Sequence, residues 1–209
     1  MIRDDEHADD EQRELAEYTV GDDVGFVRLA VSGALAVREL GAAGAGPLHR
    51  LRTTIRRDDD VVAVDASPRT VVIVYTEEVE PGEAGAGTDP AEPVAACTRV
   101  AAVRVDRKTF DESVVELSRP RCGHELGPFF TSAVGDAVSV AWPERTGGAG
   151  EARAPIVGLA HLRVMPTGTP ELGRVAHAAE SIVDAGCGEE QCWAVALGRG
   201  DTPKVLRYR

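Results

Sequence analysis

Val71-Val72-Ile73-Val74-Tyr75-Thr76-Glu77 is a run of mostly β-branched residues that ends in polar ones, and it has two later counterparts. These read Val138-Ser139-Val140-Ala141-Trp142-Pro143-Glu144 and Trp193-Ala194-Val195-Ala196-Leu197-Gly198-Arg199. Each run follows a similar lead-in, namely Val64-Asp65, Val134-Gly135-Asp136 or Val183-Asp184. Because lead-in and run recur together, the repeated unit is an antiparallel hairpin, and we predict an all-β protein.

A second strand follows each copy of the hairpin. Residues 98–106 follow the first copy, residues 156–165 the second and residues 204–209 the third. The linkers 82–93 and 147–155 are rich in Gly, Ala, Pro and acidic residues and have no periodicity, as in exposed loops. The chain therefore predicts about three blade-like units of short strands. Within them, residues 172–179 fit a short helix nearly as well as a strand.

Two of these segments resemble a known repeat. Trp142 closes a strand that reads Val-x-Trp, and Ala102-Val103-Arg104-Val105-Asp106 matches a strand that reads Ala-x-Val-Asp. This combination resembles the degenerate repeat of bacterial β-propellers, over residues 24–209. The resemblance implies a truncated propeller of about three blades, since complete propellers usually close with about 4 to 8. The alternative is a β-sandwich with fortuitously similar strands.

An open arc of blades would leave unpaired strand edges at its ends. Such edges pair readily with another strand, from a second copy of the chain or from a peptide. We therefore expect two kinds of partner, a second copy in a homodimer and a peptide or protein ligand. Val205 and Leu206 lie in the alternating last segment of the sequence, which is the candidate edge strand.

Composition and charge limit the possible partners further. A hydrophobic share of 43% suffices for a core, and we expect a single all-β domain over residues 24–209. Residues 1–23 are predicted to be an acidic, disordered tail, because residues 1–17 supply half of the net charge of −12. An acidic protein is not expected to bind nucleic acid, which requires a concentrated cationic surface.

Arginines on strand faces are the candidate ligand-binding residues. The densest basic stretch, residues 49–57, is followed by three aspartates that would largely cancel its field. Arginine forks nevertheless recognise carboxylates, so an acidic peptide is the expected ligand, although such faces are more often simply solvated. The candidate contact residues are Arg50, Arg52, Arg104, Arg163, Arg207 and Tyr208.

Cys187 and Cys192 flank a polar turn. Free thiols are the favoured interpretation, because cysteines are mainly reduced in the cytoplasm, and a disulfide across the hairpin is the possible alternative. A zinc site is poorly supported, because neither Cys-x-x-Cys spacing nor a following His pair occurs. Cys97 with Cys122 and His124 is a still weaker ligand set. No metal and no cofactor is predicted.

The sequence contains no targeting signal that we recognise. The first basic residue, Arg3, has no apolar run behind it, as a secretory signal would require. No stretch approaches the about 18 apolar residues of a membrane-spanning helix. We therefore expect a cytoplasmic protein that does not contact membranes.

Searches for catalytic motifs are negative. The sequence has no Gly-x-Ser-x-Gly elbow, no His-Glu-x-x-His, no phosphate-binding loop and no dinucleotide fingerprint, so no catalytic residue is predicted. The expected function is a non-catalytic peptide- or protein-binding module, an accessory factor that could hold a ribosomally made precursor peptide for tailoring enzymes in natural-product biosynthesis. The alternative is a hydrolase or lyase whose site forms at the mouth of a ring completed by a partner chain.

Overall fold

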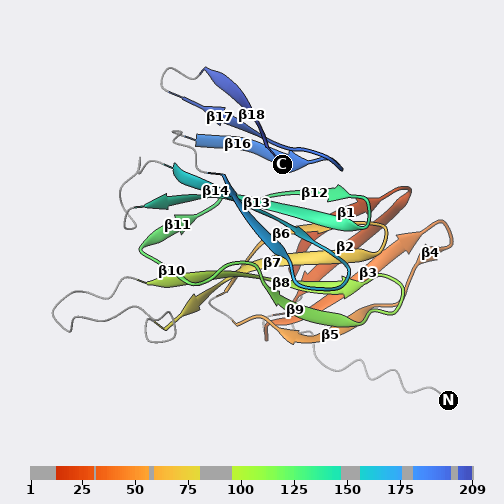
Figure 1. Ribbon diagram of the computed structural model, residues 1–209. Coiled ribbons are helices and arrows are strands. Elements are labelled where there is room, and N and C mark those ends of the chain that lie inside the picture. Colours follow the sequence, from red (N-terminus) through yellow and green to blue (C-terminus); the bar gives the residue numbers. More distant parts are fainter. Residues whose placement is uncertain are drawn as a thin grey trace, which may run out of the picture. The chain divides into compact units, whose positions relative to one another are not determined.

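The computed structural model describes residues 13–30, 32–56, 59–80, 96–146, 156–175, 181–198 and 202–208 (Figure 1). Across these ranges the chain forms strands and no helix, and all strand pairs are antiparallel. The predicted all-β fold is confirmed. The described part of the chain accordingly offers no helix that could cross a membrane.

The chain divides into two compact units, Met1–Arg57 and Asp58–Arg209. The first unit contains one sheet in the order β1-β2-β3-β4, with β5 also paired to β3. Its strands are β1 (Arg13–Val20), β2 (Asp23–Leu29), β3 (Ala34–Gly41), β4 (Gly44–Ala45) and β5 (His49–Thr54).

Strand β1 lies inside the segment 1–23 for which the sequence predicts a disordered tail. The prediction is wrong for residues 13–20, because an apolar alternation accompanies the acidic residues: Tyr18 is buried between exposed Glu17 and Thr19. The Tyr18 hydroxyl donates a hydrogen bond to Glu39, and its ring occupies the space left by the missing side chain of Gly25. Residues 1–12 lie outside the described ranges.

The second unit contains three sheets that follow one another along the chain. The first, here the β7–β8 sheet, has the order β10-β8-β7-β6 with β9 paired to β8. The second, the β13–β14 sheet, has the order β11-β13-β14-β15 with β12 paired to β13, and the third, the β17 sheet, has the order β16-β17-β18.

The strands of these sheets are as follows. The β7–β8 sheet comprises β6 (Asp60–Ala66), β7 (Thr70–Val79), β8 (Cys97–Asp106), β9 (Glu112–Glu116) and β10 (Arg121–Cys122). The β13–β14 sheet comprises β11 (His124–Leu126), β12 (Phe130–Val134), β13 (Ala137–Thr146), β14 (Ile156–Val164) and β15 (Glu171–Val175). The β17 sheet comprises β16 (Ser181–Cys187), β17 (Cys192–Leu197) and β18 (Pro203–Tyr208). Residues 171–175, in the segment that fits helix or strand, are thus a strand.

The three repeated runs of the sequence fall on β7, β13 and β17, the central strands of the three sheets. Strand β13 has two buried faces, since residues 137–144 are all buried. On one face Val138, Val140 and Trp142 pack with Val72 and Val74 of β7 in one apolar cluster. Because side chains alternate along a strand, Ser139 and Ala141 point to the opposite face.

That opposite face packs against the β17 sheet. Ala141 and Leu159 of the β13–β14 sheet form a second cluster with Ile182, Ala185, Ala194 and Ala196, against which Leu206 and Tyr208 of β18 also pack. Small alanines occupy most of this layer. The two sheets therefore pack through small side chains, and polar residues of β13 and β14 on this face lie opposite the β17 sheet.

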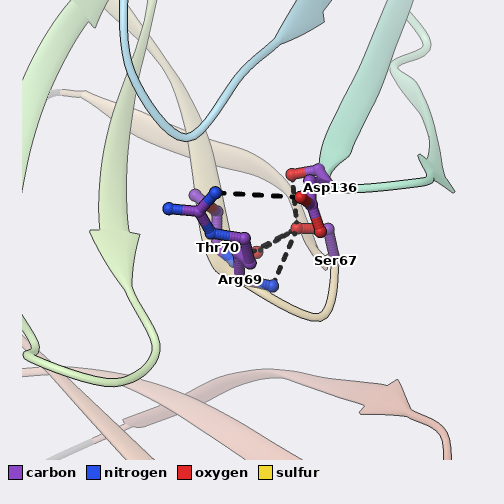
Figure 2. Close-up of polar contacts among 4 residues, drawn as sticks. All are labelled: Ser67, Arg69, Thr70 and Asp136. Carbon is purple, nitrogen blue, oxygen red and sulfur yellow. Dashed lines mark hydrogen bonds and ion pairs between the residues drawn. The ribbon is translucent and has the colours of Figure 1, made fainter.

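A buried serine joins the turns of the first two sheets of this unit (Figure 2). The Ser67 hydroxyl, between β6 and β7, donates a hydrogen bond to the Asp136 carbonyl at 2.8 Å and accepts one from the Thr70 N–H at 3.1 Å. The neighbouring pair of Arg69 and Asp136 is longer, 3.8 Å, and half exposed. The buried hydroxyl is therefore the stronger link between the two hairpins.

Candidate functional site

Strand β18 is an edge of the β17 sheet. It pairs with β17 from Leu197↔Pro203 to Cys192↔Tyr208, and within the described residues no strand pairs with its other side. Val205 is 61% exposed, and Lys204 and Arg207 are also exposed. Leu206 and Tyr208, by contrast, pack on the apolar cluster between the sheets. Leu206 and Tyr208 thus hold one face of the strand, on which Lys204 is also exposed, and Val205 and Arg207 are presented to solvent on the other face.

The predicted arginines are distributed over different parts of the fold. Arg50 and Arg52 lie on β5 in the first compact unit, and both are exposed. Arg104, Arg163 and Arg207 lie on β8, β14 and β18, in three different sheets of the second unit. The structure therefore does not unite the five arginines on one sheet.

Arg104 and Arg163 hold backbone carbonyls of neighbouring segments. Arg104 donates hydrogen bonds to the carbonyls of Met165 and Gly168 and to the Ser113 hydroxyl. Arg163 donates to the carbonyls of Gly188 and Glu189, at 2.7 and 3.0 Å. Each guanidinium fixes a turn of the adjacent sheet. Their contacts are structural, which leaves Arg207 as the predicted arginine that lies on the exposed face of the edge strand.

A cluster of His161, Cys187 and Cys192 lies between the β13–β14 sheet and the β17 sheet. His161 Nε2 is 2.6 Å from Cys187 Sγ and 3.4 Å from Cys192 Sγ, and the two cysteines form a disulfide across the β16–β17 hairpin. The same nitrogen is 2.9 Å from the Ser139 hydroxyl. The Cys187 N–H donates to the Ser132 hydroxyl at 3.1 Å. The His161 nitrogen, two sulfurs and the Ser139 hydroxyl therefore lie close together, and Ser132 holds the backbone of Cys187 beside them.

Burial sets the protonation of this cluster. Desolvation, with a smaller contribution from the charge of Arg163, lowers the pKa of His161 to about 4, so the imidazole is neutral at neutral pH. The Tyr208 ring packs edge-on against His161, with ring centroids 5.7 Å apart. Burial raises the pKa of Tyr208 to about 12, and its hydroxyl has no hydrogen-bond partner in the described part of the chain. The Tyr208 side chain is therefore partly buried against His161 and the cluster between the sheets.

The sequence predicts a possible disulfide of Cys187 and Cys192 but not its contact with His161. The alternation of residues along β14, which the sequence shows, places His161 on one face with Leu159 and Arg163. The sequence does not show that this face packs against the β17 sheet, and that packing brings His161 to the β16–β17 hairpin. The other two cysteines, Cys97 and Cys122, form a second disulfide between β8 and β10.

Comparisons with known proteins contribute little to this description. No protein-family model matches the chain, and no curated protein matches it. Among solved structures, Pyrococcus horikoshii acylaminoacyl peptidase is similar at 9% sequence identity with a TM-score of 0.30, over 94% of this chain and 44% of that one. This chain thus spans less than half of that protein, and a likeness at this level decides neither fold nor function.

Proposed function

We propose that this protein is a non-catalytic peptide- or protein-binding module whose receptor is the open edge of β18. The observation that carries the proposal is an edge strand whose Leu206 and Tyr208 pack, partly buried, on the cluster between the sheets, while Val205 is 61% exposed. An exposed, partly apolar edge offers unpaired backbone groups to an added strand. Since Lys204 and Arg207 accompany Val205 on this strand, an extended acidic peptide is the preferred ligand.

The same edge can accept a second copy of the chain. Successive antiparallel sheets of sequence-adjacent strands are the arrangement of propeller blades, and this supports the truncated propeller as the finer description of the fold. In that description, homodimerisation and ligand binding both use an open blade edge. The narrower role, carrying a precursor peptide in the cytoplasm for tailoring enzymes, rests on analogy and stays a prediction.

A binding experiment tests the edge directly. Fluorescence anisotropy would compare a labelled peptide of alternating Glu and Val with its Lys–Val counterpart. We expect the acidic peptide alone to bind, more weakly at high salt. Val205→Glu should weaken its binding at least about tenfold, because a negative charge on the edge repels the acidic peptide and opposes strand addition. Val114→Glu on β9 is the matched control, since Val114 is 50% exposed. Equal binding of both peptides, or equal loss in both variants, would contradict the proposal.

Self-association is measured in parallel by sedimentation over a wide concentration range. If β18 closes a dimer, the wild type is dimeric and Val205→Glu shifts the protein to monomer, whereas Val114→Glu does not. A wild type that stays monomeric at every concentration would remove the homodimer from the proposal and leave the peptide as the partner.

One observation favours the alternative, a hydrolase or lyase. The Ser139 hydroxyl lies 2.9 Å from His161 Nε2, which is the hydrogen-bonded pair that activates a serine nucleophile. Ser139, however, is only 1% exposed, so a substrate carbonyl has no path to its oxygen. The binding module is therefore the better-supported proposal.

A further inference from the structure

Three metal-ligating side chains meet between the β13–β14 sheet and the β17 sheet. The ligating atoms of His161, Cys187 and Cys192 all lie within 4.8 Å of one another. Cysteine sulfur and histidine nitrogen are the ligands that Zn²⁺ prefers. We propose that when the Cys187–Cys192 disulfide is reduced, these three residues bind one Zn²⁺ ion, so that the same site holds either a disulfide or a metal.

The distances require only small side-chain movements. With Zn–S of about 2.3 Å and Zn–N of about 2.0 Å, tetrahedral geometry sets the sulfurs about 3.8 Å apart and each sulfur about 3.5 Å from the nitrogen. The distance of 3.4 Å between His161 Nε2 and Cys192 Sγ already fits. The distance of 2.6 Å to Cys187 Sγ must grow by about 1 Å, as the sulfurs separate on reduction.

The backbone around the site is held by bonds other than the disulfide. The Ser132 hydroxyl accepts a hydrogen bond from the Cys187 N–H, and Arg163 donates hydrogen bonds to the carbonyls of Gly188 and Glu189 in the hairpin turn. Cys187 and Cys192 are also a register pair of β16 and β17. Opening the disulfide therefore frees two sulfurs without releasing the strands that position them.

Burial and charge suit a dithiolate zinc site. Cys187 and Cys192 are 8% and 4% exposed, and an isolated charge there would be costly. Two thiolates, one neutral imidazole and Zn²⁺ sum to zero charge, which removes that cost. A tetrahedral ion would need a fourth ligand. The Ser139 hydroxyl lies 2.9 Å from His161 Nε2, so this oxygen or a water molecule can supply it.

The chemistry balances with a dithiol as reductant. The protein disulfide accepts two electrons and two protons and becomes two thiols, while the dithiol becomes its own disulfide. Zn²⁺ then replaces both thiol protons, which leave to solvent. In reverse, an incoming disulfide takes two electrons from the thiolates, the Cys187–Cys192 bond re-forms, and the ion departs. Metal content would thus report the redox state of the surroundings.

The test uses Co²⁺ as a spectroscopic substitute for Zn²⁺. The purified full chain is reduced with a phosphine, which is removed under anaerobic conditions, and is then titrated with Co²⁺. We expect one equivalent to bind with thiolate charge-transfer absorption and the visible bands of a tetrahedral ion, and Zn²⁺ to abolish both. The untreated, disulfide-bonded protein should show neither. A reduced protein that binds no Co²⁺, whether folded or unfolded by circular dichroism, overturns the proposal.

Matched variants assign the ligands. Reduction also opens Cys97–Cys122, so Cys97→Ser/Cys122→Ser must keep the signal, and Cys187→Ser/Cys192→Ser must lose it. Removing a residue that merely hydrogen-bonds to a metal ligand costs about 10- to 100-fold in metal affinity. Because His161 is a direct ligand in this proposal, His161→Ala should lower the affinity at least about tenfold. His124→Ala should leave the affinity unchanged. Full signal without Cys187 and Cys192, or equal affinity of the two histidine variants, contradicts the assignment.

Discussion

Ser67 shows how a single hydroxyl contributes to stability in this fold. It is fully buried and serves two hairpins at once, as donor to Asp136 and acceptor from Thr70 (Figure 2). Replacing Ser67 by Ala leaves the Asp136 carbonyl and the Thr70 N–H without this partner. We expect the free energy of unfolding in urea to fall by about 1 to 3 kcal/mol.

Arg69→Ala is the control for Ser67→Ala. It removes the half-exposed ion pair with Asp136 and a weaker attraction to the exposed Asp106, and such surface pairs contribute about 0 to 1 kcal/mol. If Arg69→Ala proved the more destabilising of the two, the ion pair and not the buried hydroxyl would be the main link between the hairpins.

Asp65 predicts a pH dependence of stability. Desolvation raises the pKa of its carboxyl, and this outweighs hydrogen bonds from the Ala66 N–H and the Thr131 side chain, which lower it. A carboxyl with a raised pKa in the folded state favours folding most when protonated. Its contribution is therefore complete below the unfolded pKa of about 3.9 and is lost as pH rises through the folded pKa.

The test is Asp65→Asn, which keeps an oxygen acceptor and cannot ionise. Between about pH 4 and neutral pH, the free energy of unfolding of the wild type should fall relative to that of the variant. Urea unfolding at a series of pH values gives this difference. Parallel pH profiles for the two proteins would mean that Asp65 titrates alike in the folded and unfolded chains.

Strands differ in how well the sequence predicts them, and the reason is packing on one or both faces. The runs assigned to β7, β13 and β17 are recognisable because their residues are nearly all apolar. Strands β7 and β13 are buried on both faces, as such runs predict, whereas β17 alternates buried and partly buried residues. Strand β1 is not predicted because it begins within the acidic residues 1–17, and the alternation of buried Tyr18 with exposed Glu17 and Thr19 is short. The His161 cluster is missed because it depends on which sheet faces which, and no local pattern records that contact.

Arg104 illustrates a connection between elements that a strand pattern cannot reveal. The sequence predicts that it contacts a ligand. In the structure it lies at the turn after β14 and donates hydrogen bonds to the carbonyls of Met165 and Gly168. Arg104→Ala should lower the free energy of unfolding by about 1 to 2 kcal/mol, because bonds from charged donors are lost. Faster amide exchange confined to residues 165–168 would identify the turn as the affected element.

Arg207→Ala provides the comparison for Arg104→Ala. Arg207 is exposed on β18, and surface substitutions of this kind usually change stability by less than about 0.5 kcal/mol. Affinity for the acidic peptide should fall more in Arg207→Ala than in Arg104→Ala. A larger fall in Arg104→Ala would mean that Arg104 contacts the ligand, as the sequence predicts.

The division of the chain at residue 57 leads to a prediction about autonomy. The sequence suggests one domain over residues 24–209, whereas the compact units are Met1–Arg57 and Asp58–Arg209. Both inter-sheet clusters, both disulfides and the Ser67 link lie within the second unit. About 150 residues also suffice for a core that buries most of the apolar surface. We therefore expect residues 58–209 to fold when expressed alone.

Hydrogen exchange measures whether they do. Amides of β7, β13 and β14 should be as strongly protected in the fragment as in the full chain, because these strands lie at the centre of the two packed layers. The fragment should also retain Co²⁺ binding after reduction, since every proposed ligand belongs to it. A fragment that loses protection in β13 would show that the unit depends on residues 1–57 for its stability, and the chain would then be a single domain, as the sequence suggests.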